Sequence, residues 1–210
     1  ADECELIGAD GEDAAAIARL RANPPADRRM SQSFASLVWR EGVKDYVRSY
    51  IGHLRDIGLY DRVIAYQIGA GVVSEWIKGY ADMVPMCGDY SAPMQRAFRA
   101  WLRRKYSNYV YLLRKAWDDP DADFDTADVP APVEQFRSRA GVFRDTTREQ
   151  KVIDYYTCVA EIASDAMIDF CATVKAETGG DKLAGGFFGY TMELSWNLNF
   201  FGFGPSNTFH

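Results

Sequence analysis

The sequence has few of the residues and motifs on which common catalytic sites are built. Of its 210 residues only two are histidine, His53 inside a predicted helix and His210 at the last position. A Ser-His-Asp triad needs a histidine beside its nucleophile, so this class of hydrolase is disfavoured. There is no GxxxxGK[ST] motif and no GxGxxG motif that opens a helix, so no cradle for nucleotide phosphates is predicted.

Cysteine is scarce and scattered as well. The four residues, Cys4, Cys87, Cys158 and Cys171, form no CxxC pair and have no histidine nearby. This spacing disfavours a zinc site and a dense disulfide framework. Because Cys158 and Cys171 fall within the pattern of a long helix, we expect buried free thiols rather than bridges. We expect no metal and no other cofactor.

Long apolar runs are missing too. No run reaches the ~20 residues that a membrane-spanning helix needs, so we expect a soluble protein without a membrane partner. A net charge of -6 argues against nucleic acid as a partner, because phosphate binding depends on Lys and Arg. The first residues lack the basic and apolar parts of a leader and an initiating Met, so either a leader has been removed or the start is a cut. The compartment, cytoplasmic or secreted, and a homo-oligomer stay open.

The pattern along the chain is that of an α/β fold. Residues 1 to about 30 are acidic and alanine-rich, with a short helix around Asp13–Ala22 and no clear core face, and we interpret them as an N-terminal excursion. Apolar residues at helical spacing then predict a helix that Ser36 caps and Gly58 stops. An apolar run from Arg62 to Gly69 predicts a buried strand. A helix followed by a buried strand is typical of parallel pairing.

The rest of the chain continues this pattern. The further predicted elements are a helix around Met94–Leu102, a helix over Tyr109–Trp117, a long surface excursion between Asp118 and Arg144, a long helix capped by Thr146 or Thr147 and ended by Gly179 and Gly180, and a second apolar strand over Leu183–Tyr190 that contains Gly185 and Gly186 in close packing. A complete eight-stranded barrel takes ~250 residues, and two strands alone leave their edges unpaired. We therefore expect a piece of a barrel, with strand partners on both sides or from a second copy.

The most informative segment is Tyr66–Trp76, after the first predicted strand. The apolar run of the predicted strand is interrupted by Gly69 and Gly71, and Glu75 and Trp76 follow next to each other. In α/β barrels, catalytic groups lie at the carboxyl ends of the strands. The indole and the strand end would desolvate Glu75 and raise its pKa, as a general acid requires. The alternative is a solvated glutamate and a tryptophan that packs on the rim.

Paired carboxylates remain as the chemistry that the residues support. In retaining glycosidases one carboxylic acid protonates the leaving oxygen and a second carboxylate, about 5 Å away, attacks the sugar. Flat aromatic faces suit a pyranose ring, although ordinary core packing explains them equally. The aromatic residues near the two strand ends are Trp76, Tyr80, Tyr190, Trp196 and Phe200.

An ordered series of motifs covers most of the chain, from about Ser31 to Trp196. The motifs are Ser33-Phe-Ala-Ser36, Trp39-Arg40, the run Tyr60–Trp76, the run Phe98–Tyr106 and Ala116-Trp117. This series resembles the middle of a β-galactosidase-like glycoside hydrolase barrel of the family 42 type. The resemblance implies a partial (β/α)8 TIM barrel over residues 31–210, about strands 3–5, with long helices and an excursion between strands 4 and 5.

The resemblance also implies roles for individual residues. Arg62–Ala70 would be the fourth strand with Glu75 as general acid/base after it, and Leu183–Tyr190 the fifth, with Tyr190 near the sugar. The remaining expected substrate-binding residues are Trp76, Ser74, Glu193 and Trp196. The family places asparagine before the acid/base residue, where this chain has Ser74, and its nucleophile after the seventh strand, beyond residue 210. Glu193 is the only late glutamate that could replace it.

The function that follows is retaining hydrolysis of β-galactosides or related glycosides. A glycoside or oligosaccharide would be the substrate. The alternative is a non-catalytic carbohydrate-binding or interaction protein that uses the same scaffold, because a fold alone does not fix function.

Overall fold

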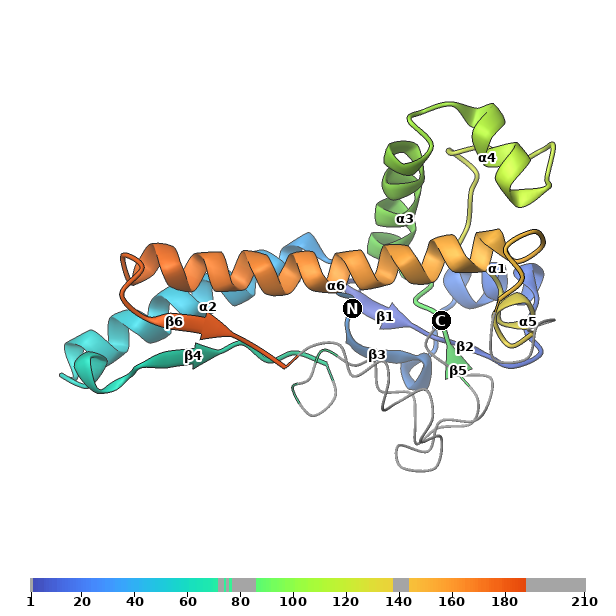
Figure 1. Cartoon of the computed structure of the whole chain (residues 1–210). Helices are drawn as coiled ribbons and strands as arrows, with labels where there is room; N and C mark the ends of the chain where they lie inside the picture. The colour runs from blue at the N-terminus through green and yellow to red at the C-terminus, as the bar shows by residue number, and fades with distance from the viewer. Residues whose placement is uncertain (1, 72–73, 75, 77–85, 138–143, 188–210) are drawn as a thin grey trace.

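The long helix α6 (Gln150–Glu177) is the element along which the other described helices and strands lie (Figure 1). The computed structural model describes residues 2–71, 74, 76, 86–137 and 144–187. The other described elements are β1 (Cys4–Leu6), β2 (Gly8–Ala9), α1 (Ala14–Ala22), the short 3-10 helix η1 (Ala26–Arg28), β3 (Arg29–Gln32), α2 (Leu37–Asp56), the 3-10 helix η2 (Tyr60–Arg62), β4 (Ala65–Gln67), β5 (Met86–Cys87), α3 (Ala92–Lys105), α4 (Val110–Trp117), α5 (Pro132–Gln135) and β6 (Leu183–Gly185).

The described strands pair two by two. Strands β1 and β3 are antiparallel, as are β2 and β5. Strands β4 and β6 are parallel, with Ala65 opposite Leu183 and Gln67 opposite Gly185. Helices α2 and α6 lie beside this parallel pair (Figure 1). The expected α/β class with parallel pairing is therefore confirmed for the described part of the chain.

Two clusters of buried side chains lie along α6. The first, at the N-terminal half of α6, includes Tyr155 and Cys158 of that helix and packs α3 and α4 against it. The second, at the C-terminal half, includes Phe170 and Val174 and packs against α2 and β4. Ile162 contacts both clusters, so one helix spans the two cores.

The predicted helix ends are largely confirmed by hydrogen bonds. The Ser36 hydroxyl accepts from the Trp39 N–H at 2.9 Å and caps α2, and Gly58, with φ of 70°, follows the end of that helix. Such a cap satisfies one of the N–H groups that a helix start leaves without a partner. Gly179 and Gly180 also adopt positive φ after α6. The helix that was predicted around Asp13–Ala22 is α1, capped by the Asp13 carboxylate.

The start of α6 differs from the prediction. Neither Thr146 nor Thr147 caps it, because the helix begins at Gln150 with Glu149 at the N-cap position. The Asp145 carboxylate instead accepts from both the N–H and the hydroxyl of Thr147, at 2.9 and 2.6 Å. These bonds favour a turn before the helix rather than the first turn of the helix itself.

The predicted strands are shorter than expected. Arg62 lies in the 3-10 helix η2, and β4 covers Ala65–Gln67 rather than Arg62–Gly69 or Arg62–Ala70. Tyr66 is buried while its two neighbours in β4 are exposed, because helices cover one face of the strand in the described structure. Of the second predicted strand, β6 occupies Leu183–Gly185, and residues 188–190 lie outside the described residues.

Two predicted excursions contribute to the core. In residues 1–30, where no core face was expected, Leu6 and Ile17 are buried in the first cluster. Between Asp118 and Arg144 the chain packs inward at Phe124 and Val129, so the prediction of a surface excursion is wrong for the described part of that segment. The apolar residues there follow neither a helical nor a strand period, and this is why the pattern did not reveal their burial.

All four cysteines are free thiols, as was expected for Cys158 and Cys171, but the expected burial is confirmed for Cys158 and not for Cys171. Cys87 and Cys158 are buried, and Cys4 and Cys171 are partly exposed. Among the described residues, no helix combines the length and the apolar character that crossing a bilayer would require.

Candidate functional site

The candidate site lies at the carboxyl ends of the parallel strands β4 and β6, where the sequence places Glu75. The hydrogen-bond ladder continues one rung past β4, because the Ile68 N–H donates to the Gly185 carbonyl at 2.7 Å. The chain then turns through Gly69 and Ala70 toward position 75. The ends of parallel strands are where α/β barrels carry their functional groups.

Trp76 fixes the far side of this turn. Its backbone N–H donates to the Ala70 carbonyl at 2.8 Å, and its indole Nε1–H donates to the Ile68 carbonyl at 3.1 Å. The side chain is 6% exposed and packs against the rings of Phe34 and Phe170, with centroids 5.4 and 6.0 Å away. Trp76 is thus part of the second buried cluster, with both of its N–H groups satisfied.

Gly69 and Ser74 lie against each other within the turn. A Cβ built on Gly69 would lie 2.6 Å from the Ser74 Cβ and 3.1 Å from its carbonyl oxygen, so only glycine fits at position 69 without a shift. Ser74 is exposed and has φ of 63°, and Trp76 has φ of 61°. Positive φ is uncommon for residues with a side chain, so the surrounding contacts hold this turn in a costly backbone conformation.

Gly186 closes the site from the side of β6. A Cβ at this position would lie 2.5 Å from the Ile68 carbonyl oxygen and 3.5 Å from the Trp76 Nε1. The close packing that was predicted for this glycine is therefore confirmed. At Gly185 no atom lies within 4 Å of the place that a Cβ would occupy, so close packing is absent there.

The other predicted site residues are not placed by the structure. Glu75, Tyr190, Glu193 and Trp196 lie outside the described residues. The structure brings two of the predicted residues, Ser74 and Trp76, to the same turn, one exposed and one buried.

Tyr66 lies on the face of β4 that packs toward α2, and the sequence analysis assigned it no role in the site. The Tyr66 hydroxyl is buried and has no hydrogen-bond partner among the described residues. Burial raises its pKa, and the nearby Tyr60 contributes in the same direction. Its ring meets the edge of Tyr50 at a centroid distance of 6.5 Å. Tyr66 therefore serves mainly to pack β4 on α2, and it stays neutral at ordinary pH.

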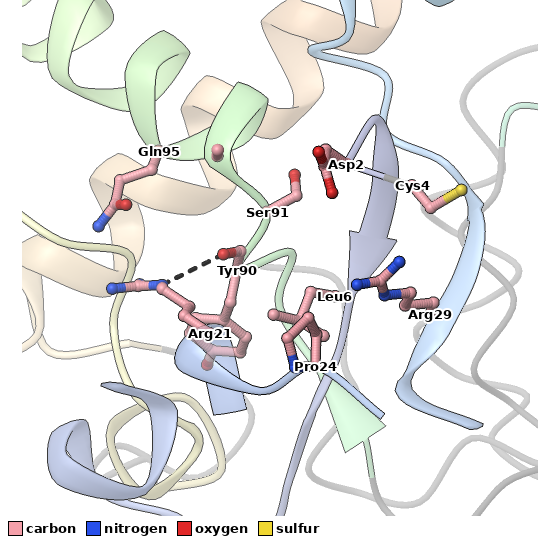
Figure 2. A pocket seen from close by; sticks show the side chains of 10 residues that line it. Asp2, Cys4, Leu6, Arg21, Pro24, Arg29, Tyr90, Ser91 and Gln95 are labelled. Carbon is pink, nitrogen blue, oxygen red and sulfur yellow. Dashed lines mark hydrogen bonds between the residues drawn. The ribbon is translucent and has the colours of Figure 1, made fainter. Parts of the chain in front are cut away.

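A separate pocket of about 170 Å³ lies between α1, β1, β3 and the N-terminal end of α3 (Figure 2). Arg21 lines it and donates through Nε to the Tyr90 carbonyl at 3.2 Å and through Nη1 to Asp128 at 2.7 Å. Arg29 and Gln95 also line it. None of the predicted site residues does. The lining residues come from segments far apart in the sequence, so no sequence pattern indicated this pocket.

Metal binding has no support in the described part of the chain, where no three His, Cys, Asp or Glu side chains are grouped to hold an ion.

Comparison with known proteins gives matches to solved structures alone. No family model matches the chain, and no curated protein matches it. A catalytic mutant of a GH42 beta-galactosidase from G. stearothermophilus matches with a TM-score of 0.54 and 18% identity, over 79% of this chain and 21% of that one. A cold-adapted beta-galactosidase from Rahnella sp. matches with a TM-score of 0.50 and 17% identity, over 88% of this chain and 26% of that one.

The chain thus spans about a quarter or less of the length of the solved structures that it matches. The two matches cover most of this chain, and both are beta-galactosidases. In fold, the chain resembles part of a GH42 beta-galactosidase, which confirms the resemblance predicted from its motifs.

Proposed function

We propose that this chain is part of a retaining glycoside hydrolase that acts on β-galactosides or related glycosides, with Glu75 as the general acid/base. One observation carries the proposal: the turn after β4, at the carboxyl end of a parallel strand pair, leads to Glu75 in a chain whose fold resembles GH42 beta-galactosidases. Residues 31–210 would form part of a (β/α)8 barrel, and residues 1–30 an N-terminal extension of it.

The chemistry requires a carboxyl group that is protonated before bond cleavage. Glu75 would donate its proton to the glycosidic oxygen as the bond to the sugar breaks, and would then take a proton from the attacking water. Apolar surroundings favour the neutral form of a carboxylic acid, and Trp76, which follows Glu75 in the sequence, is buried. We assign the nucleophile to none of the described residues.

Four of the predicted substrate-binding residues remain part of this proposal. The exposed Ser74 hydroxyl is available to a sugar hydroxyl, in the place where the family has asparagine. Tyr190, Glu193 and Trp196, which follow β6 in the sequence, remain proposed contacts. A glycoside or oligosaccharide is the proposed partner.

The test uses the full-length protein that contains these 210 residues, and aryl β-galactosides with different leaving groups. Removing the acid with Glu75→Gln should slow cleavage of a nitrophenyl galactoside by about 10²–10⁴-fold, because positioned proton transfer contributes that much. The loss should be much smaller for a dinitrophenyl galactoside, whose leaving group needs no proton. The matched control is Glu41→Gln, which removes an exposed carboxylate on α2 and should leave the rates unchanged.

A second outcome would favour the non-catalytic alternative. If the full-length protein binds galactosides, as followed by tryptophan fluorescence, but shows no turnover, the scaffold binds sugar without catalysis. Absence of both binding and turnover would overturn both proposals.

A further inference from the structure

The hydrogen-bond ladder between β4 and β6 ends at the carbonyl of Ile68. In a parallel ladder, a residue whose N–H bonds one carbonyl accepts through its own carbonyl from the residue two positions further along the partner strand. The Ile68 N–H bonds the Gly185 carbonyl, so the next donor would be the N–H of Phe187. In the described structure the donor to this carbonyl is the indole Nε1–H of Trp76, at 3.1 Å. The indole thus takes the place of the next rung.

The indole is held on its other sides by aromatic rings and by the backbone of β6. Phe34 and Phe170 pack on it, and Gly186 lets the chain after β6 approach it closely. A buried Trp that donates its N–H has both its apolar area and its polar group satisfied, which leaves it a single stable position. A side chain that is 6% exposed offers almost no face to a sugar ring.

The backbone of Trp76 closes the same turn. Its N–H donates to the Ala70 carbonyl at 2.8 Å, and on the other side of position 75 the side chain of Ser74 lies against Gly69. Of the residues before and after Glu75 in the chain, Ser74 therefore lies close to the end of β4, and Trp76 is hydrogen-bonded to it.

We infer that Trp76 is a positioning residue for Glu75 and not a contact for the sugar. The inference rests on the proposed role of Glu75 as the acid/base, and it replaces the expectation that Trp76 binds substrate. Its physical basis is that the indole hydrogen bond and its burial hold the backbone on the carboxyl side of Glu75. Small displacements of a catalytic group reduce the rate of the chemical step strongly, whereas loss of a sugar contact weakens binding.

The test compares Trp76→Phe with Trp39→Phe. Trp76→Phe keeps an aromatic ring but removes the donor to the Ile68 carbonyl. Trp39 is the matched control, because its ring packs on the same Phe34 and Phe170, at 5.7 and 5.3 Å, and no hydrogen bond of its indole occurs within the described part of the chain. Trp76→Phe should lower kcat by about 10- to 100-fold with KM nearly unchanged. Trp39→Phe should leave both nearly unchanged. An increase in KM with kcat unchanged in Trp76→Phe would overturn the inference and restore the sugar contact.

A second measurement does not depend on activity. Amide hydrogen exchange at position 76 should become faster in Trp76→Phe and not in Trp39→Phe, because loss of the indole anchor frees the N–H that bonds Ala70. Unchanged exchange would overturn the anchoring. The parallel assay of Glu75→Gln separates the two claims. If Glu75→Gln loses activity and Trp76→Phe does not, the positioning role of Trp76 is wrong and the proposed function stands. If Glu75→Gln keeps full activity, the proposed function is wrong, and hydrogen exchange alone decides whether the indole anchors the backbone.

Discussion

The carboxylate of Asp154 in α6 is fully buried and lies 2.6 Å from the ammonium group of Lys105 at the end of α3. The same carboxylate accepts from the Tyr106 hydroxyl at 2.6 Å, from the Trp117 indole at 2.8 Å and from the Gln150 amide at 2.6 Å. A buried charge is stable when it is paired and its lone pairs are used. Asp154 therefore joins α3, α4 and α6 at the first cluster.

Removing this carboxylate should destabilise the protein strongly. Asp154→Ala leaves an ammonium group and several buried donors without their acceptor, so we expect the free energy of unfolding to fall by about 3–5 kcal/mol. Asp165→Ala removes an exposed carboxylate from the same helix and should change it by less than about 0.5 kcal/mol. Urea unfolding followed by circular dichroism measures both. Equal losses in the two variants would contradict this account of Asp154.

A methyl group should be tolerated at one of two neighbouring glycines and not at the other. Gly186→Ala places a carbon 2.5 Å from the Ile68 carbonyl oxygen, so the end of β6 must move, and we expect a loss of about 1–3 kcal/mol. At Gly185 nothing lies within 4 Å of the added carbon, and the cost should be a few tenths of a kcal/mol at most. Thermal unfolding of the two variants decides the matter. If Gly185→Ala lost as much stability as Gly186→Ala, the effect would come from strand propensity and not from packing against Ile68.

The buried thiols should resist alkylation in the native protein. Burial raises the pKa of Cys87 and of Cys158 to about 12 in each case. Because the thiolate is the reactive form, a raised pKa keeps both thiols neutral and unreactive at pH near 8. Iodoacetamide labelling read by mass spectrometry should modify the partly exposed Cys4 and Cys171 first, and Cys87 and Cys158 only after urea is added. Labelling of Cys158 at the rate of Cys4 in the native protein would contradict its burial.

Alkaline pH should destabilise the first cluster through its tyrosines. Burial raises the pKa of Tyr155 and of Tyr90 well above 10, and raises that of Tyr106, whose hydroxyl also donates to Asp154. Tyrosine in the unfolded chain ionises near pH 10, so above that pH the unfolded state binds fewer protons than the native state. The contribution of these tyrosines to the free energy of unfolding should therefore be constant below pH 10. Above pH 10 the free energy of unfolding should fall by about 1.4 kcal/mol per pH unit for each such tyrosine.

Urea unfolding at a series of alkaline pH values measures this slope. Tyr155→Phe should reduce the slope, whereas Tyr109→Phe, which alters an exposed ring, should not. A slope that Tyr155→Phe leaves unchanged would show that this buried hydroxyl ionises as it does in the unfolded chain.

Helices were predictable from the sequence because their signals are local. The Ser36 cap and the apolar spacing that follows it predicted α2, and Gly179 and Gly180 predicted the end of α6. The start of α6 was missed because Thr147 bonds with Asp145, and a pattern cannot distinguish a polar residue in such a turn from one that caps a helix. Similar chemistry serves both arrangements.

Strands and irregular segments were less predictable because their burial depends on distant partners. The burial of Phe124 and of Leu6 follows from contacts with helices far away in the sequence, which no local period reveals. At the candidate site, the sequence correctly paired two strands and placed a turn after the first. It did not show that Trp76 faces the core, because an aromatic residue beside a loop glutamate looks the same whether it packs inward or outward.

Helix α6, 28 residues or roughly 42 Å long, belongs to both buried clusters at once. Because one helix is shared by two cores, a shift of the helix in one core moves its side chains in the other. Substitutions at Asp154, near one end, and at the rings around Phe170, near the other, should therefore not have independent effects on stability. Fraying of α6 at either end should weaken the packing of the cluster at the other end. The packing around Trp76 is in this way tied to side chains of the first cluster, more than two helical turns away along α6.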